Sequence, residues 1–128
     1  MGVVSYDVSA SDRRLSATFP LHTEEGVKAF LEQIYSLEEL KFSTGDFDVV
    51  IWLADFYDTI ATVGLSRAEH KVIYFVYFEG YKQKELVYML GLRKNTINTL
   101  LKRGMKKIAA HYEKIRRLEE VENESTNR

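Results

Sequence analysis

The sequence contains no cysteine, one proline and only seven glycines among its 128 residues. Without cysteine the chain can form neither a disulfide framework nor a thiolate zinc site, and it offers no thiol nucleophile. Few helix-breaking residues predict few loops and a mainly α-helical fold. With 45% apolar residues, a chain of this length is long enough for one domain with a hydrophobic core.

Long apolar runs are also missing. No stretch approaches the roughly 20 residues that a transmembrane helix needs, and the first residues lack the basic and then apolar pattern of a signal peptide. We therefore expect a soluble, cytoplasmic protein.

Groupings that carry catalysis or bind metals are absent as well. There is no phosphate-binding glycine loop, no zinc-protease histidine pair and no nucleophile flanked by a base, and His22, His70 and His111 have unrelated spacings. Four aspartates lie close in sequence: Asp46, Asp48, Asp55 and Asp58. They occupy polar positions of one expected helix, whereas a metal needs ligands from several directions. The sequence predicts no enzyme, no cofactor and no metal site.

Charge is distributed unevenly along the chain. Residues 81–117 hold eleven Lys and Arg against two Glu, a net charge of +9, whereas residues 1–80 carry −7 and residues 118–128 carry −3. A nearly neutral protein with one basic third is typical of a module that presents one face to a polyanion.

The basic third begins with the pattern of two helices joined by a short turn. The first is expected over Gln83–Leu90, where Leu86 and Leu90 lie four apart on one face. Gly91 follows where the chain must reverse, and glycine adopts the left-handed conformation without steric cost. A second helix is expected from Arg93 or Lys94 to Lys106.

That second helix has an apolar and a polar side. The inward positions are Ile97, Leu100, Leu101 and Gly104. The outward amides, hydroxyl and ammonium groups are those with which a recognition helix contacts base edges and phosphates in a major groove. Candidate base contacts are Asn95, Asn98 and Thr99, and candidate phosphate contacts are Lys82, Lys84, Arg93, Lys94, Lys102, Arg103 and Lys106. The sequence predicts a DNA-binding helix-turn-helix; a purely structural hairpin with a solvated basic face is the alternative.

These residues also resemble the fourth, promoter-recognising region of bacterial sigma factors. The segments that carry the resemblance are LADFYDTI (53–60), LSRAEHKVIYFVYFEGYKQKEL (65–86), GL (91–92), NTI (95–97) and IAAHY (108–112). Together they cover about residues 50–115 and are most similar to the short sigma-like regulators of bacteriophages and prophages of Gram-positive bacteria.

The resemblance implies a phage transcription activator that binds double-stranded DNA and contacts bacterial RNA polymerase in the cytoplasm of the host. The N-terminal half shows no match to the promoter-melting sigma region, so we do not expect a complete sigma factor. Three alternatives stay open. They are a dimeric repressor, a ring-forming small terminase-type DNA-packaging protein, and an interaction module that does not read DNA.

Two positions depart from the pattern of that family. Val87 stands where a small residue usually lets the two helices cross closely, which predicts a wider crossing. Arg93 stands where serine or aspartate often caps the recognition helix; arginine cannot accept amide hydrogens, and its charge opposes the helix dipole. A DNA phosphate against Arg93 would offset that cost.

The first 22 residues show a different pattern. Apolar residues alternate with polar ones at Val4, Tyr6 and Val8, and again at Leu15, Ala17, Phe19 and Leu21. Period-two alternation predicts strands, with residues 9–14 as the turn of a short N-terminal β-hairpin. The alternative is a flexible arm that becomes ordered on a partner.

Two helices are expected next. Thr23 can cap the first, whose apolar stripe is Val27, Phe30, Leu31, Ile34 and Leu37. Residues 41–46 interrupt the pattern. The second helix begins near Phe47 and ends at Gly64, with expected inward residues Val50, Ile51, Ala54, Tyr57 and Ile60.

Ser66 and Glu69 have the spacing of a capping box. The helix behind it carries Val72, Ile73, Phe75, Val76 and Phe78, which we interpret as core rather than as a base-stacking surface.

The helical pattern continues beyond Lys106. Steps of four and three link Leu101 to four further residues, Met105, Ile108, Tyr112 and Ile115. This spacing indicates either the seam of a homodimer or packing on the chain's own domain. The predicted organisation is an N-terminal part (1–64), a sigma-region-like part (65–118) and a disordered tail (119–128).

Overall fold

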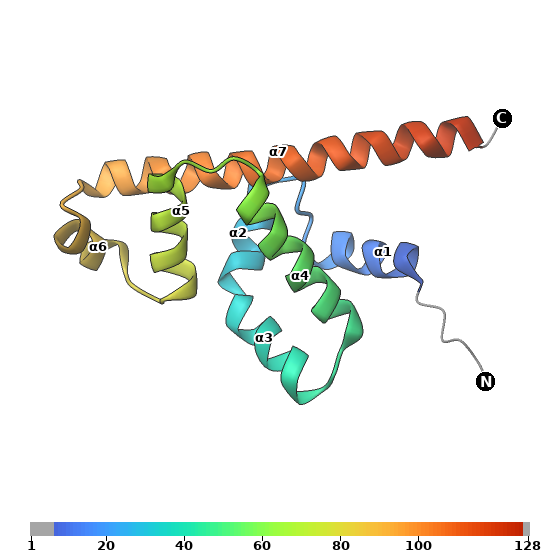
Figure 1. Cartoon of the computed structure of the whole chain (residues 1–128), viewed down its shortest axis with the longest axis horizontal. Coiled ribbons are helices and arrows are strands. Elements are labelled where there is room, and N and C mark those ends of the chain that lie inside the picture. Colours follow the sequence, from blue (N-terminus) through green and yellow to red (C-terminus); the bar gives the residue numbers. More distant parts are fainter. Residues whose placement is uncertain (1–6, 127–128) are drawn as a thin grey trace.

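Helices account for most of residues 7–126, the part of the chain that this computed structural model describes. The elements in chain order are α1 (Val8–Thr18), α2 (Glu24–Glu32), α3 (Ile34–Ser43), α4 (Phe47–Thr62), α5 (Arg67–Ile73), the π-helical turn η1 (Tyr74–Phe78), α6 (Gln83–Leu90) and α7 (Lys94–Thr126). The mainly α fold is thus confirmed. In Figure 1 α7 runs along one edge of the molecule, and the other helices lie to one side of it.

The core lies where α7 crosses the other helices, since α7 packs against α2, α4, α5 and α6. Phe30 of α2 occupies its centre, with its ring centroid 4.4 Å from that of Phe56 and 5.2 Å from that of Phe19. Burial of each such side chain contributes about 1.5–3 kcal/mol. The expected stripe of the first helix is buried in full, although the chain divides it into α2 and α3 near Gln33.

Two predicted helix starts have their caps. Thr23 Oγ1 accepts from the backbone N–H of Gly26 at 3.0 Å. Ser66 Oγ accepts from the N–H of Glu69 at 3.1 Å, and Glu69 Oε1 accepts from the N–H of Ser66 at 2.8 Å. The capping box before α5 is therefore confirmed. The aromatic run behind it packs against the core at Phe75, Val76 and Phe78, as interpreted.

The predicted β-hairpin is wrong from Val8 onward, because its turn and the start of its second strand form α1. Val4 and Tyr6 lie outside the described residues. The alternation of apolar and polar residues is too short to decide the structure here. The contacts that these residues make are spaced by one helical turn, which favours a helix. Asp7 caps the helix by accepting from the N–H of Ala10, while Ser11 is buried one turn before the half-buried Leu15.

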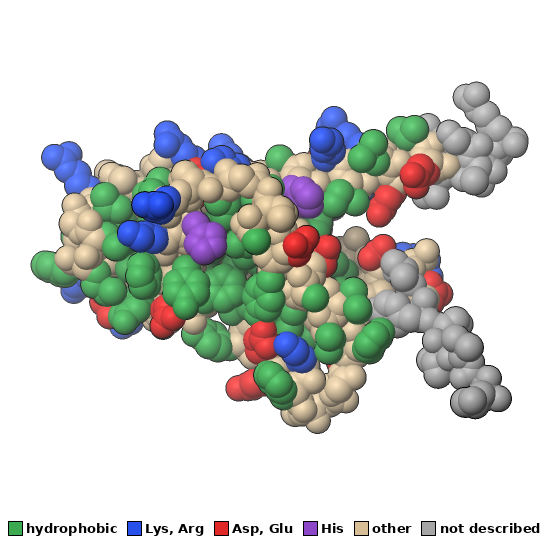
Figure 2. Space-filling view, in the orientation of Figure 1, with side chains coloured by type: hydrophobic (Ala, Val, Ile, Leu, Met, Phe, Trp, Pro, Cys, Tyr) green, Lys and Arg blue, Asp and Glu red, His purple; other side chains and the backbone are tan. Residues whose placement is uncertain are grey.

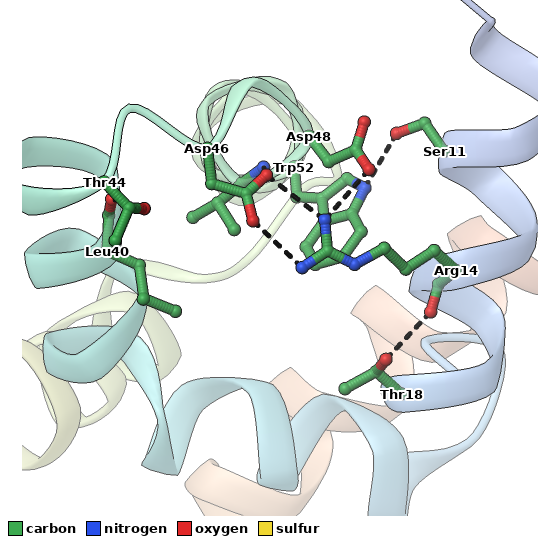
Figure 3. Close-up of polar contacts among 9 residues, drawn as sticks. Ser11, Arg14, Thr18, Leu40, Thr44, Asp46, Asp48 and Trp52 are labelled. Atoms are coloured by element: carbon green, nitrogen blue, oxygen red, sulfur yellow. Dashed lines mark hydrogen bonds and ion pairs between the residues drawn. The ribbon is translucent and has the colours of Figure 1, made fainter.

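Arg14 and Ser11 attach α1 to α4, as Figure 3 shows. Arg14 donates to Asp46 at 2.9 Å and to Asp48 at 3.0 Å, and its guanidinium lies 4.9 Å from the centroid of the Trp52 ring. Trp52 Nε1 donates to Ser11 Oγ at 3.1 Å. These contacts to residues more than 30 positions away favour a helix at a site where local alternation indicated a strand.

The expected inward face of α4 is displaced by one position. The buried apolar residues are Val49, Trp52, Leu53, Phe56 and Ile60, whereas Ile51 and Ala54 are exposed. Both sets have helical spacing because this helix is apolar around most of its circumference. The face with the indole and the phenyl ring is buried, which removes more apolar area from water.

The predicted disorder after residue 118 is wrong for 119–126, which continue α7. Side-chain pairs support the helix immediately before this stretch and at its start. Arg116 bonds Glu113 at 3.0 Å and Glu120 at 2.6 Å, and Arg117 bonds Glu113 at 2.9 Å. Such pairs at three- and four-residue spacing each stabilise a helix by about 0.2–0.5 kcal/mol.

The proposed dimer seam is also wrong for its first half. Met105 and Ile108 are 7% and 0% exposed within a single chain, so neither is accessible to a second copy. Tyr112 is half-buried, and its hydroxyl donates to Asp55 of α4 at 3.0 Å. The alternative, packing on the chain's own domain, is confirmed for this stretch, whereas Ile115 is exposed.

Candidate nucleic-acid interface

The predicted pair of helices is formed by α6 and α7. Gly91 has φ +65° and ψ +29°, the left-handed conformation that the reversal requires. Leu86 and Ile97 are fully buried, one on each helix, and Leu101 and Gly104 extend the same inward side. The Arg93 carbonyl accepts the first α7 hydrogen bond, from the N–H of Ile97 at 3.0 Å. The turn between the two helices consists of residues 91–93.

The three candidate base-reading residues are all exposed on the first turns of α7. Thr99 Oγ1 donates its proton to the backbone carbonyl of Asn95 at 2.9 Å. The Thr99 hydroxyl can then accept a hydrogen bond from a base through its lone pairs, and its methyl group can contact a base. Asn95 and Asn98 carry side-chain amides, which both donate and accept, so they are the stronger candidates for base readout.

All seven candidate phosphate contacts are exposed, at the start of α6 or within it, on the turn or on the outer side of α7. Among residues 7–122, none of the seven forms an ion pair with a carboxylate. Other cations of α7 differ in this respect, because Lys107, Arg116 and Arg117 are all paired with glutamates. The unpaired set can therefore bind an external anion without breaking an internal ion pair.

Lys107 has a structural role, since it joins α7 to the start of α5. Its Nζ lies 2.6 Å from Glu69 Oε1 and donates to the carbonyl of Gly64 at 3.3 Å. Burial acts to raise the pKa of Glu69, but the bonds from Lys107 and Ser66 outweigh it and hold the pKa below its ordinary value. This contact fixes α7 against the helix on which the pair α6–α7 rests.

Basic and acidic side chains lie on different parts of the structure, as they lie in different parts of the sequence. Figure 2 shows Lys and Arg side chains along the outer edge of α7 and beside α5, with Asp and Glu mainly over α3, α4, α1 and the C-terminal end of α7. Arg67 and Lys71 of α5 were not predicted as part of the basic surface. They are exposed and line a shallow cleft with Leu90 and Leu92, next to the start of α7. In the sequence, the indication that Arg67 and Lys71 share a surface was their spacing of four residues on an expected helix.

The carboxylates near the start of α4 bind an arginine side chain. Hydrogen bonds from Arg14 hold the pKa of Asp46 below its ordinary value. Among the side chains that the structure describes, no group of three or more His, Asp or Glu is placed to hold a metal ion. None of the helices described is both long and apolar enough to cross a bilayer.

No protein-family model, curated protein or solved structure matches the chain.

Proposed function

We propose that the protein is a sequence-specific DNA-binding transcription regulator, and that α6 and the first turns of α7 form its helix-turn-helix. One observation carries this proposal. Exposed amides on α7 lie among seven exposed cations that form no ion pair with the described carboxylates, while most acidic side chains lie elsewhere. A surface with that composition suits a polyanion that also presents hydrogen-bonding edges.

The two kinds of side chain have separate roles in this proposal. Asn95 and Asn98 are suited to adenine, whose N6 and N7 together match the donor and acceptor of one amide. Lys102 and Lys106 follow one and two turns later on the outer side and are suited to the flanking phosphates. Arg67 and Lys71 extend the phosphate-binding surface to α5, beside the turn.

Replacing Asn98 by alanine tests the readout of bases. On the preferred site from a binding selection, we expect a loss of about 1–3 kcal/mol, and a much smaller loss on random duplex. Fluorescence anisotropy at one fixed salt concentration measures both. Gln33→Ala, which removes an exposed amide at the junction of α2 and α3, is the matched control and should change neither affinity. Equal losses on the two duplexes would make Asn98 a positioning residue.

A second surface favours activation through RNA polymerase over simple repression. Tyr35, Phe42 and Phe47 are exposed aromatic side chains on α3 and α4, and Phe42 is 81% exposed. Glu38 and Glu39 lie beside Tyr35 and Phe42. Exposed aromatic side chains with a charged rim are typical of protein-binding sites, and acidic character keeps this side away from DNA.

A pull-down of bacterial RNA polymerase, combined with transcription from the bound promoter, separates activator from repressor. We expect the full chain to retain polymerase and raise transcription, and Phe42→Asp to lose both while it still binds DNA. Lys28→Asp, an exposed change on α2, is the control. Lowered transcription without retention would indicate a repressor. A large ring in light scattering would indicate a packaging protein, and failure to select any DNA sequence would indicate an interaction module.

A further inference from the structure

A cleft of about 330 Å³ lies where α1, α4 and the C-terminal half of α7 come together. Figure 2 shows the molecule open between α7 and α1. Sites that bind small molecules enclose roughly 300–1,000 Å³ and are mainly apolar, with a few polar groups. None of the candidate base or phosphate contacts lines this cleft, so the proposed DNA surface does not account for it.

The floor of the cleft is apolar. Phe19, Leu21 and Trp52 are buried side chains that line it from α1, α4 and the segment after α1. Ile51 and Ile115 also line it, but they are 41% and 37% exposed. An apolar group in the cleft would remove the surface of these two side chains from water, which favours its binding.

The charged side chains of the cleft are mainly acidic. Asp12 of α1, Asp55 of α4 and Glu119 of α7 line it from three helices. The hydroxyl of Tyr112 donates to Asp55 Oδ2 at 3.0 Å, which leaves further lone pairs of that carboxylate free to accept. His22 and Ser16 are the other uncharged polar residues among the described lining.

One cation lines the cleft, but its charge is directed elsewhere. Arg116 bonds Glu113 at 3.0 Å and Glu120 at 2.6 Å along its own helix. Neither glutamate belongs to the described lining of the cleft. The three carboxylates therefore leave the cleft with an excess of negative charge.

The carboxylates are close enough to affect one another. Burial and the carboxylate of Asp55 raise the pKa of Asp12. Burial and the carboxylate of Asp12 raise the pKa of Glu119. A positive group among the three would offset this repulsion, because an opposite charge nearby favours the ionised form of a carboxyl.

A metal ion does not match these features. Among the described side chains, no three His, Asp or Glu are close enough together to hold one. A hydrated metal ion would also leave the apolar floor uncovered. An ammonium group on an apolar body matches both the carboxylates and the floor.

We propose that the cleft binds an amphipathic organic cation, a small molecule with an ammonium group on an aliphatic or aromatic body. The ammonium group lies among the three carboxylates, which accept charge-assisted hydrogen bonds from it. The body lies on the floor against Trp52 and covers Ile51 and Ile115. This site does not rest on the DNA-binding proposal, so each proposal can fail without the other.

The fluorescence of Trp52 tests the site, because Trp52 is the one tryptophan of the chain and lines the cleft. Hexylammonium is the probe. Methylammonium lacks its apolar body, hexanol lacks its charge, and hexanoate has the opposite charge. We expect hexylammonium to bind saturably, with an affinity about tenfold or more above those of the other three. No saturation by about 10 mM hexylammonium, or equal binding of hexanol, would overturn the proposal.

Two double variants test which carboxylates bind the probe. Asp12→Asn/Glu119→Gln removes two charges from exposed positions of the cleft, and we expect it to bind hexylammonium about tenfold more weakly. Glu32→Gln/Glu39→Gln removes two exposed carboxylates outside the cleft and should bind like the natural chain. Circular dichroism checks that both variants keep their helices. Equal losses in the two variants would indicate a general effect of net charge and contradict the site.

A lysine side chain of a protein partner has the same chemistry as the probe. A short peptide with one central lysine and blocked ends distinguishes the two sources. We expect the peptide to bind more weakly than hexylammonium, since the cleft then holds a free small molecule. Tighter binding of the peptide would assign the cleft to a protein partner and overturn the small-molecule site.

Discussion

Replacing Gly26 by alanine should destabilise the protein more than adding one methyl group at any other buried glycine of the described chain. An added Cβ would lie 1.9 Å from the carbonyl oxygen of Pro20 and 2.4 Å from its carbonyl carbon. That oxygen cannot move freely, because it accepts from the N–H of Thr23 at 3.0 Å and from its hydroxyl at 2.9 Å. Thr23 in turn caps α2.

The overlap therefore acts on backbone atoms at the junction of α1 and α2. Alanine gains about 1 kcal/mol in helix propensity over glycine, and we expect a net loss of about 3 kcal/mol despite this gain. Urea unfolding followed by circular dichroism gives the value. Gly104→Ala is the control: its Cβ would meet Ile73 Cδ1 at 2.5 Å, but a terminal methyl can rotate away, so the change should stay within about 1 kcal/mol. Equal effects at both glycines would refute the argument from Pro20.

Ile108→Asp should prevent folding, whereas Ile115→Asp should leave a folded chain. Ile108 is fully buried among apolar side chains in the core between α7 and its neighbours. An unpaired buried charge costs several kcal/mol, a large part of the roughly 5–15 kcal/mol that stabilise a typical domain. Ile115 is 37% exposed and lines the open cleft between α7 and α1, so a carboxylate there stays in contact with water.

Thermal unfolding of the two variants distinguishes the packing on the chain's own domain from the dimer seam. We expect no cooperative transition for Ile108→Asp at any protein concentration, and a transition close to that of the natural chain for Ile115→Asp. A folded, monomeric Ile108→Asp protein would restore the seam as a contact between copies.

Elements with a strong local signal were predictable from the sequence. Gly91 fixed the reversal between α6 and α7, the capping box fixed the start of α5, and the stripe from Val27 to Leu37 was buried as predicted. Gly91 adopts a conformation that few other residues could adopt, and Ser66 finds its bonding partner three residues away. The apolar stripe follows from its helical period. The exposed positions on α7 followed from its helical period alone.

The sequence-based predictions were wrong where contacts between residues far apart in the sequence decide the structure. Nothing near Arg14 indicates that it will bind Asp46 and Asp48, more than 30 residues away, yet those bonds hold α1 as a helix against α4. In α4 two faces had helical spacing, and only the position of Phe30 and Phe19 explains why Phe56 lies inward. Arg67 and Lys71 were missed for the same reason, since only the fold places α5 beside the turn.

The salt dependence of duplex DNA binding tests the central claim most directly. Affinity should fall steeply as salt rises, because each neutralised phosphate releases condensed counterions. The Lys102→Ala/Lys106→Ala variant should bind all sequences more weakly and reduce the slope of log K against log salt by about 2. The control variant Lys28→Ala/Lys41→Ala removes the same charge from α2 and α3 and should change neither the affinity nor the slope. Binding that is insensitive to salt, or equal losses in the two double variants, would contradict a phosphate-binding surface on α7.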